Sequence, residues 1–290
     1  MLKEWFLAAR PKTLFVGAAP VLAGSALAYF FGKFDWIPAL ICLVFALLAQ
    51  ITSNFVNDYY DYKKGTDRED RLGPERAVAT GKISAGAMWR ATLITISLAL
   101  LVGLSLIYYG GWWLIGVGAL VAIFAFAYSG GPYPLSYHGL GDVAVLIFYG
   151  IVPVVFTYYV QAHDFPLEVW LASIGVGLVG VNVLIVNNYR DMETDAVSGK
   201  RTTVVMFGRN RMALVYLVNC ILAYNLGYAV IGYANLLWLA VSFPFVIFSV
   251  VLWNKLQTLR GKELNKVLGM TAMNVLLYAV CMSIGLIIGK

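Results

Sequence analysis

Long apolar runs follow one another along almost the whole chain, and they constrain its fold more than any other feature. A helix that crosses the hydrocarbon core of a bilayer needs about 20 predominantly apolar residues. Only 12% of the 290 residues are charged, against about 25% in an ordinary soluble domain. These features exclude a soluble enzyme and predict an all-α polytopic membrane protein with nine transmembrane helices. The predicted spans cover residues 13–31, 37–57, 86–108, 111–128, 141–160, 167–188, 211–231, 235–254 and 268–288.

Nine spans with short connections would use up the chain, which leaves no room for a separate soluble catalytic domain. We therefore expect one membrane-embedded domain over residues 1–290, built as two four-helix units plus one helix. Any chemistry must come from the spans and from the two longest connecting segments, the cytoplasmic loops at about 58–90 and 189–210.

The basic residues predict the orientation of the chain. If the N-terminus is cytoplasmic, 19 of the 21 lysines and arginines fall on the cytoplasmic side, and only Lys33 and Lys290 fall opposite. This asymmetry is what the positive-inside rule expects. We predict an integral protein of a bacterial inner or plasma membrane, with its C-terminus outside. The net charge of +6 is explained by this topology, so no nucleic-acid partner is expected.

The acidic residues gather in two segments, one where the second predicted span ends and one where the sixth ends; together these hold nine of the 15 acids. In each segment, helical spacing of three or four residues aligns the polar side chains on one face. The aligned residues are Asn54, Asn57, Asp58 and Asp61 in the first segment and Asn187, Asp191 and Asp195 in the second.

Clustered carboxylates at the edge of a bilayer are costly and mark function. Faces of carboxylate and amide oxygens suit Mg²⁺, which shares its coordination shell with substrate phosphates. Two such faces predict a bridged diphosphate. In the competing interpretation, the acids form a solvated surface at the membrane edge, and Asn54 and Asn187 hydrogen-bond between helices.

The same residues resemble the UbiA superfamily of intramembrane prenyltransferases. The resemblance rests on Asn57-Asp58-x-x-Asp61 and Asp191-x-x-x-Asp195, each after its span. Further stretches resemble the branch of the family that prenylates 1,4-dihydroxy-2-naphthoate in menaquinone synthesis. These stretches begin at Arg10-Pro11-Lys12, at Arg76 and at Gly139-Leu140-Gly141-Asp142. The chain departs from the wider family pattern at Gly65, where many members have a third aspartate; the next acid here is Asp67.

The resemblance implies a UbiA-like helical bundle and a Mg²⁺-dependent transferase. Its substrates would be an allylic polyprenyl diphosphate and 1,4-dihydroxy-2-naphthoate. Prenylation with loss of the acceptor's carboxyl group would give demethylmenaquinone. The protein would be surrounded by membrane lipid. Two Mg²⁺ ions are expected to bridge the diphosphate. The implied metal ligands are Asn57, Asp58, Asp61, Asp67, Asn187, Asp191 and Asp195, and the four aspartates Asp58, Asp61, Asp191 and Asp195 are also the expected catalytic residues.

Cations from the loops would add charge-assisted hydrogen bonds to the diphosphate, although the positive-inside rule already accounts for their presence. We expect this role for Lys12, Arg76, Lys82, Lys200 and Arg201.

Asp142 is the least expected acid outside the two segments. Its carboxylate could act as a base or orient an acceptor hydroxyl, or it could cap the helix that begins there. We expect a catalytic role and keep capping as the alternative.

Two other functions compete with the one that the resemblance implies. Another aromatic acceptor would keep the chemistry and change the substrate, and Gly65 with Asp67 argues against this alternative. A secondary transporter would place intramembrane acids near the bilayer midplane, on broken helices within internal repeats. The acids here are predicted at helix ends instead, and that favours the enzyme.

Overall fold

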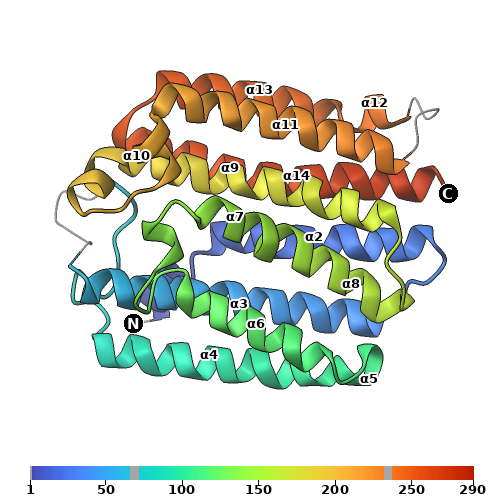
Figure 1. Cartoon of the computed structure of the whole chain (residues 1–290), viewed down its shortest axis with the longest axis horizontal. Helices are drawn as coiled ribbons and strands as arrows, with labels where there is room; N and C mark the ends of the chain where they lie inside the picture. The colour runs from blue at the N-terminus through green and yellow to red at the C-terminus, as the bar shows by residue number, and fades with distance from the viewer. Residues whose placement is uncertain (1, 66–71, 232–236) are drawn as a thin grey trace.

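A computed structural model of the chain describes residues 2–65, 72–231 and 237–290, which form one bundle of helices packed side by side (Figure 1). No β-strand occurs within these three ranges. In chain order the elements are α1 (Leu2–Ala8), α2 (Pro11–Phe30), α3 (Trp36–Lys63), α4 (Ala85–Ser105), α5 (Ile107–Gly110), α6 (Leu114–Ala127), the 3₁₀-helix η1 (Leu135–Tyr137), α7 (Gly141–Leu146), the π-helix η2 (Ile147–Ile151), α8 (Val152–Ala162), α9 (Leu167–Val197), α10 (Thr203–Phe207), α11 (Arg209–Ile231), α12 (Leu237–Val241), α13 (Phe243–Thr258), the 3₁₀-helix η3 (Gly261–Glu263) and α14 (Leu264–Ile288).

The predicted all-α membrane architecture is confirmed, whereas the count of nine spans stays a prediction. Helix occupies each of the nine predicted segments where the structure describes them. Seven helical stretches among the described residues are long and apolar enough to cross a membrane. The remaining two helices, α6 with 14 residues and α13 with 16, are shorter than the roughly 20 residues of a full crossing.

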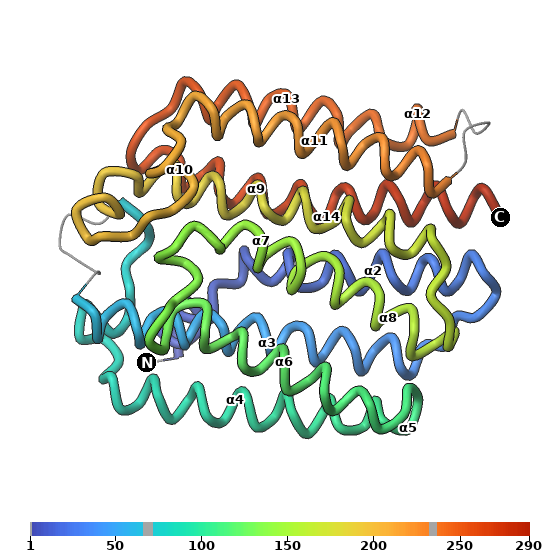
Figure 2. Tube along the Cα trace, viewed as in Figure 1, coloured from blue at the N-terminus to red at the C-terminus, as the bar shows by residue number. Residues whose placement is uncertain are grey.

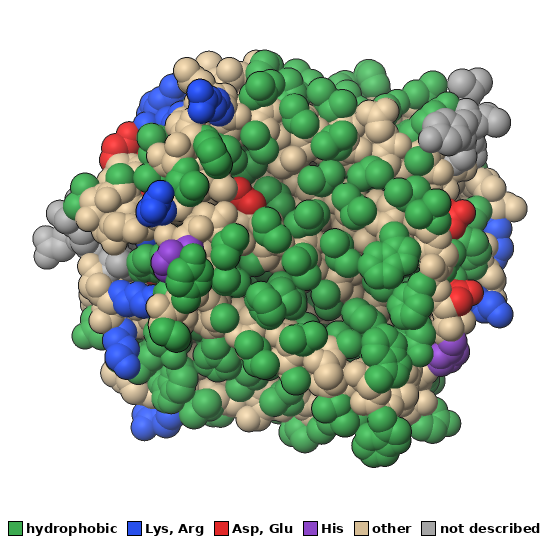
Figure 3. Space-filling view, viewed as in Figure 1, with side chains coloured by type: hydrophobic (Ala, Val, Ile, Leu, Met, Phe, Trp, Pro, Cys, Tyr) green, Lys and Arg blue, Asp and Glu red, His purple; other side chains and the backbone are tan. Residues whose placement is uncertain are grey.

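The long helices run antiparallel to their neighbours in sequence (Figure 2). The N-terminus therefore lies at the same end of the bundle as segment 72–84, segment 128–140 and α10, and the C-terminus lies at the other end. Lys and Arg side chains gather on the end that holds α10, and few appear at the opposite end (Figure 3). Between the two ends the visible surface is mostly hydrophobic, as contact with lipid requires.

The carboxylates that share a helical face lie on helices rather than in loops: Asp58 and Asp61 lie on α3, and Asp191 and Asp195 lie on α9. The loops expected from about residues 58 and 189 therefore begin later in the chain. Helix α3 continues to Lys63 and α9 continues to Val197. Each helix thus extends beyond its predicted span, and its last turns carry the carboxylates. Because a helix fixes the direction of its side chains better than a loop does, this continuation positions the polar residues firmly.

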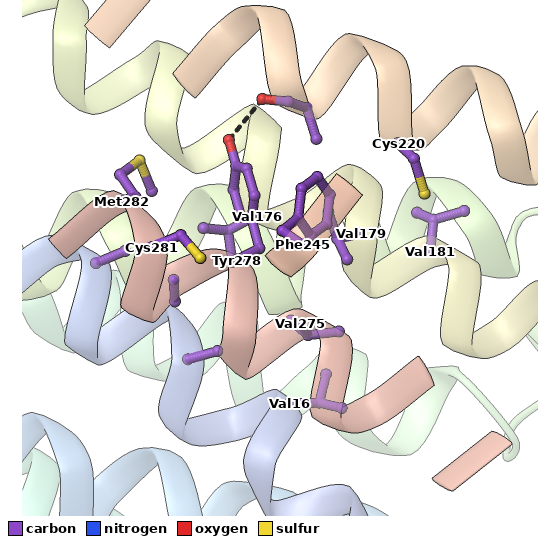
Figure 4. Packing of buried hydrophobic residues seen from close by; sticks show 14 of the residues in the cluster. Val16, Val176, Val179, Val181, Cys220, Phe245, Val275, Tyr278, Cys281 and Met282 are labelled. Atoms are coloured by element: carbon purple, nitrogen blue, oxygen red, sulfur yellow. Dashed lines mark hydrogen bonds between the residues drawn. The ribbon is translucent and has the colours of Figure 1, made fainter. Parts of the chain in front are cut away.

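Helix α9 lies at the centre of the bundle, where it contacts α2, α7, η2, α11 and α14. Around it, Val176, Val179, Phe245 and Tyr278 pack in the main hydrophobic core (Figure 4). The hydroxyl of Tyr278 donates a hydrogen bond of 2.7 Å to the carbonyl oxygen of Ala223, so this buried polar group is satisfied.

Glycines bring α9 unusually close to the π-helix η2. A Cβ atom on Gly150 of η2 would lie 2.4 Å from the Cα of Gly177 on α9. Only two residues without side chains allow this approach, which is the kind of contact that small residues make between membrane helices. The contact sets the distance between α9 and the helix that carries Asp142 and Tyr149.

Candidate active site

One cavity of about 480 Å³ brings the two acidic segments together. Although these segments lie about 130 residues apart in sequence, the last turns of α3 and α9 both contribute to its wall. The residues that line it include Asn54, Asn57, Asp58, Asp61, Asn187, Asp191 and Asp195.

The four aspartates in this wall are buried: Asp58 is 2% exposed, Asp61 5%, Asp191 8% and Asp195 9%. Burying a carboxylate is costly unless positive charge or hydrogen-bond donors compensate for the lost water. A solvated surface at the membrane edge would leave these side chains exposed. The burial therefore contradicts that competing interpretation.

Asp61 lies between two cations. Arg76 donates from Nη2 to Oδ2 of Asp61 across 3.1 Å, and Nζ of Lys200 lies 3.5 Å from Oδ1. Lys200 follows the end of α9, where Gly199 adopts a φ of +74° and the Lys200 amide donates to the carbonyl oxygen of Asp195. This turn resembles the usual glycine-containing end of a helix, and it directs Lys200 toward α3.

The amides of the first segment have different roles. Asn57 accepts a hydrogen bond of 2.6 Å from Ser129. Asn54 instead donates to the carbonyl oxygen of Ala9 and to the hydroxyl of Thr13, so it joins α3 to the start of α2. For Asn54, the structure favours the interpretation as a residue that hydrogen-bonds between helices.

Arg190 organises the second segment, and the sequence analysis missed it. Its guanidinium is 1% exposed and binds Asp191 through Nε and Nη2, with an Nε to Oδ1 distance of 2.8 Å. Nη2 also donates to Oδ1 of Asn187, and Nη1 donates to Oδ1 of Asn265. An arginine next to an aspartate at the end of a predicted span was the available signal, since charges at that position require partners.

Three of the five cations predicted to bind diphosphate line the cavity: Lys12, Arg76 and Lys200. Lys82 and Arg201 are absent from its wall. Lys82 forms an exposed ion pair with Glu75, and this pairing raises the pKa of Lys82. We leave Lys82 and Arg201 out of the proposed site because neither contributes to the cavity surface.

A cationic group that was not predicted lies near this wall. Lys64, which follows α3, donates to the carbonyl oxygen of Ser129 and lies 4.3 Å from the centre of the Tyr137 ring. Lys200 lies 5.0 Å from the centre of the same ring. Partial burial lowers the pKa of Lys64, and the charge of Asp61 opposes this change. Tyr137 therefore holds two ammonium groups close together.

Asp142 also lines the cavity, and its capping role is wrong. It stands in the first turn of α7, but no side chain caps the start of that helix. Its Oδ1 atom is buried and has no hydrogen-bond partner among the described residues. An unsatisfied buried acceptor is unusual in a folded protein, and the side chain that carries it belongs to the cavity wall.

The polar wall suits Mg²⁺, because the ion prefers hard oxygen ligands and usually completes its shell with water and substrate phosphates. Carboxylate and amide oxygens from α3 and α9 supply such ligands on two walls of the same cavity. Among the described residues, no group of three or more acidic, histidine or cysteine side chains lies together in the arrangement of a metal site. Asp67, a further predicted ligand, lies outside the described residues.

A second, apolar cavity of about 290 Å³ adjoins the polar one. Its wall comes from α2, α3, α4, α5, α6, α7, η2 and α8, and it is mostly aliphatic and aromatic. Five residues line both cavities, so the two adjoin there: Gln50, Ser53, Tyr128, Val145 and Tyr149.

Comparison with known proteins identifies the family. The model of the UbiA prenyltransferase family matches residues 18–278. The chain belongs to this family. It is therefore an integral membrane prenyltransferase, and family membership decides against the secondary transporter.

Named relatives and solved structures extend the likeness. The chain is 35% identical to the 1,4-dihydroxy-2-naphthoate octaprenyltransferase of Haemophilus influenzae, over 99% of this chain and 97% of that protein. It is 39% identical to the enzyme of the same name from Escherichia coli, over 71% and 69% of the two chains. Its fold is similar to a UbiA homolog from Archaeoglobus fulgidus bound to DMAPP and Mg²⁺, with a TM-score of 0.65, 16% identity and coverage of 97% and 99%.

Proposed function

We propose that this protein transfers a polyprenyl group from its diphosphate to 1,4-dihydroxy-2-naphthoate, with decarboxylation to demethylmenaquinol, the reduced form of demethylmenaquinone, at the cytoplasmic end of the bundle. The observation that carries the proposal is the joining of a buried, carboxylate-lined cavity to an apolar one. The first accommodates a diphosphate with its metal ions, and the second accommodates a hydrocarbon chain. Relatives named as 1,4-dihydroxy-2-naphthoate octaprenyltransferases support the choice of acceptor.

In this proposal, the residues on α3 and α9 share two Mg²⁺ ions with the substrate. The α3 side offers Asn57, Asp58 and Asp61, and the α9 side offers Asn187, Asp191 and Asp195. When bound, Mg²⁺ neutralises charge on the diphosphate and makes it a better leaving group. The Mg²⁺-bound structure of the Archaeoglobus homolog supports the use of this metal in the family.

Cations of the chain complete the binding of the diphosphate. Arg76 and Lys200 already lie within 3.5 Å of Asp61, so they can contact phosphate oxygens that approach the same carboxylate. Lys12 lines the same cavity from the start of α2. Their charge-assisted hydrogen bonds hold the leaving group as its negative charge develops.

The apolar cavity binds the prenyl chain and keeps water from the reacting carbon. An allylic cation formed when the carbon–oxygen bond breaks would otherwise react with water. Tyr128 and Tyr149 line both cavities, where their ring faces can stabilise positive charge by about 0.5–2 kcal/mol each. Other tyrosines from the same end serve packing instead: Tyr59 and Tyr60 contact the ring of Trp89.

Asp142 orients the acceptor in this account. Its carboxylate lines the cavity, where it can accept a hydrogen bond from a ring hydroxyl, and this bond increases electron density on the attacking ring. A carbon–carbon bond then forms between the ring and the allylic carbon, and the carboxylate of the acceptor leaves as carbon dioxide. Asp142 is thus separate in role from the carboxylates on α3 and α9.

Product formation by the purified protein tests the proposal. The protein is incubated with 1,4-dihydroxy-2-naphthoate, a polyprenyl diphosphate and Mg²⁺, and prenylated product is measured by mass spectrometry. Wild type is expected to form demethylmenaquinol, which air oxidises to demethylmenaquinone before detection, and Asp61→Ala and Asp191→Ala to form none while retaining their fold. Omitting the acceptor while monitoring diphosphate release distinguishes transfer from hydrolysis. Wild-type protein that ignores this acceptor but prenylates 4-hydroxybenzoate would overturn the assignment.

A further inference from the structure

Asn265, in the first turn of α14, bridges two parts of the cavity wall that are distant in sequence. Its Oδ1 accepts a hydrogen bond of 2.7 Å from Nη1 of Arg190. Its Nδ2 donates one of 2.9 Å to the carbonyl oxygen of Leu72. The side-chain amide of Asn265 therefore makes two hydrogen bonds: its oxygen binds a residue of α9, and its nitrogen binds the segment between α3 and α4.

On the α9 side, Asn265 fixes the orientation of a buried guanidinium. Arg190 binds Asp191 with two nitrogen atoms and binds Asn187 with one of them, so its position determines the positions of both oxygen-bearing side chains. Partners that orient metal ligands in this way are important, because removing one costs about 10-fold to 100-fold in metal affinity or activity. Asn265 supports Arg190 at its remaining terminal nitrogen.

On the other side, Asn265 holds the beginning of segment 72–84, which carries Arg76. Further along this segment, Ala77, Val78 and Ile83 pack in a small hydrophobic cluster with Phe55. The Leu72 end is held by the amide of Asn265. The segment is thus fixed at both sides of Arg76, whose guanidinium contacts Asp61.

These contacts form a continuous path from Asp191 through Arg190, Asn265 and segment 72–84 to Asp61. We propose that Asn265 is a positioning residue that couples the α9 carboxylates to the segment carrying Arg76. Through this coupling, the side chains on both walls of the cavity are held in positions from which they can bind the same ligand. The nature of that ligand, a prenyl diphosphate with divalent metal, rests on the proposed function. The coupling itself is a property of the protein without ligand.

The test compares two asparagines on the same helix. Asn265→Leu removes both hydrogen bonds with little change in volume. Asn274→Leu is the matched control, because Asn274 also uses its Nδ2 in a buried hydrogen bond, to Ser249, but does not line the cavity. Asn265→Asp separates the two contacts, since it keeps an acceptor for Arg190 and loses the donor to Leu72.

Two measurements are made on each full-length protein. The first is hydrogen–deuterium exchange of segment 72–84 without ligand, where the amides of Thr80, Gly81 and Ile83 are hydrogen-bonded within the segment. The second is the dissociation constant of Mn²⁺, measured by electron paramagnetic resonance with geranylgeranyl thiolodiphosphate present. Prenyl transfer by the wild type is measured in parallel.

Asn265→Leu is expected to exchange faster in segment 72–84 and to bind Mn²⁺ about 10-fold more weakly. Asn265→Asp should show the faster exchange while its Mn²⁺ affinity stays within about threefold of wild type, because Arg190 keeps its acceptor. Asn274→Leu should change neither quantity. If Asn265→Leu does not fold, the hydrogen–deuterium exchange of segment 72–84 in Asn265→Asp tests the proposal on its own.

Unchanged exchange in both Asn265 variants would overturn the proposal, even if Mn²⁺ affinity fell, since Asn265 would then act on the ligand directly. Equal effects in Asn274→Leu would also overturn it, because they would reflect general destabilisation of α14. Failure of the proposed function is a separate result: wild type would then form no product, while the exchange measurement would still report on the coupling.

Discussion

Arg76 and Asp61 form an ion pair at the wall of the polar cavity, with 3.1 Å between Nη2 and Oδ2 and only 8% of each side chain exposed. The pair joins segment 72–84 to the last turns of α3. Because the cavity also contains the carboxylates of α9, a diphosphate bound there would meet a cation that is already held in place. Arg76 is therefore part of a prepared binding surface rather than a mobile surface charge.

Arg76→Ala should raise the KM for polyprenyl diphosphate about 10-fold, since a hydrogen bond to a charged group contributes about 1.5–3 kcal/mol. Steady-state kinetics at saturating acceptor measure this change. Lys82→Ala is the control: Lys82 does not line the cavity, and its exposed ion pair with Glu75 is of a kind that contributes little. A KM that rises equally in both variants would mean that general basic charge, not the position of Arg76, binds the diphosphate.

Asp142→Asn should lower kcat about 100-fold through loss of a group that acts on the acceptor. Diphosphate affinity should not change, because Asp142 lies on α7 and the proposed metal ligands lie on α3 and α9. Titration with a polyprenyl thiolodiphosphate measures that affinity, and product formation measures kcat. Weakened diphosphate binding with unchanged kcat would assign Asp142 to the leaving group instead.

Ala46→Phe should select against long prenyl donors. Ala46 lines the apolar cavity but not the polar one, so a larger side chain removes room for the hydrocarbon and leaves the diphosphate site intact. We expect the kcat/KM for an octaprenyl donor to fall by about 5-fold to 150-fold, as 1–3 kcal/mol of overpacking would cause, with geranyl diphosphate still used. Leu98→Phe, exposed on α4, should leave this ratio unchanged. A fall for both donors would contradict the assignment of the cavity.

Gly150→Ala should destabilise the protein. The added Cβ would lie 2.4 Å from the Cα of Gly177, an atom of the backbone that cannot rotate away, and overpacking of this kind costs about 1–3 kcal/mol or more. Thermal unfolding in detergent measures the change. Gly180→Ala on α9 is the control, since its Cβ would meet nothing closer than 3.7 Å. Equal Tm values for the two variants would show that the helices can separate at little cost.

Local patterns in the sequence predicted the parts of the site that depend on one helix at a time. Asp58 and Asp61 share a face because helical spacing places them there, and the same holds for Asp191 and Asp195. Apolar runs predicted the helices themselves. The ends of α3 and α9 were placed too early, because the first polar residues of a membrane helix do not terminate it when they face a cavity rather than lipid.

Contacts between helices were beyond the reach of such patterns. Asn265 lies 75 residues from Arg190 and 193 from Leu72, and no spacing rule relates them. The same limit explains why Lys82 and Arg201 were wrongly expected in the cavity wall. They were chosen for their charge and their position near a motif. Which cations reach the cavity depends instead on the packing of segment 72–84 and on the turn after α9. Lys200 reaches Asp61 through that turn, whereas Arg201, the next residue, does not line the cavity.

The location of bound metal tests the central claim most directly, which is that the ends of α3 and α9 bind divalent ions and diphosphate in one cavity. A crystal of the protein with Mn²⁺ and a polyprenyl thiolodiphosphate would reveal the ions by anomalous scattering. We predict Mn²⁺ within coordination distance of Asp58 or Asp61 and of Asp191 or Asp195, with the diphosphate between them. Diphosphate bound in the cavity with no Mn²⁺ beside either helix, or Mn²⁺ only outside the cavity, would contradict the account.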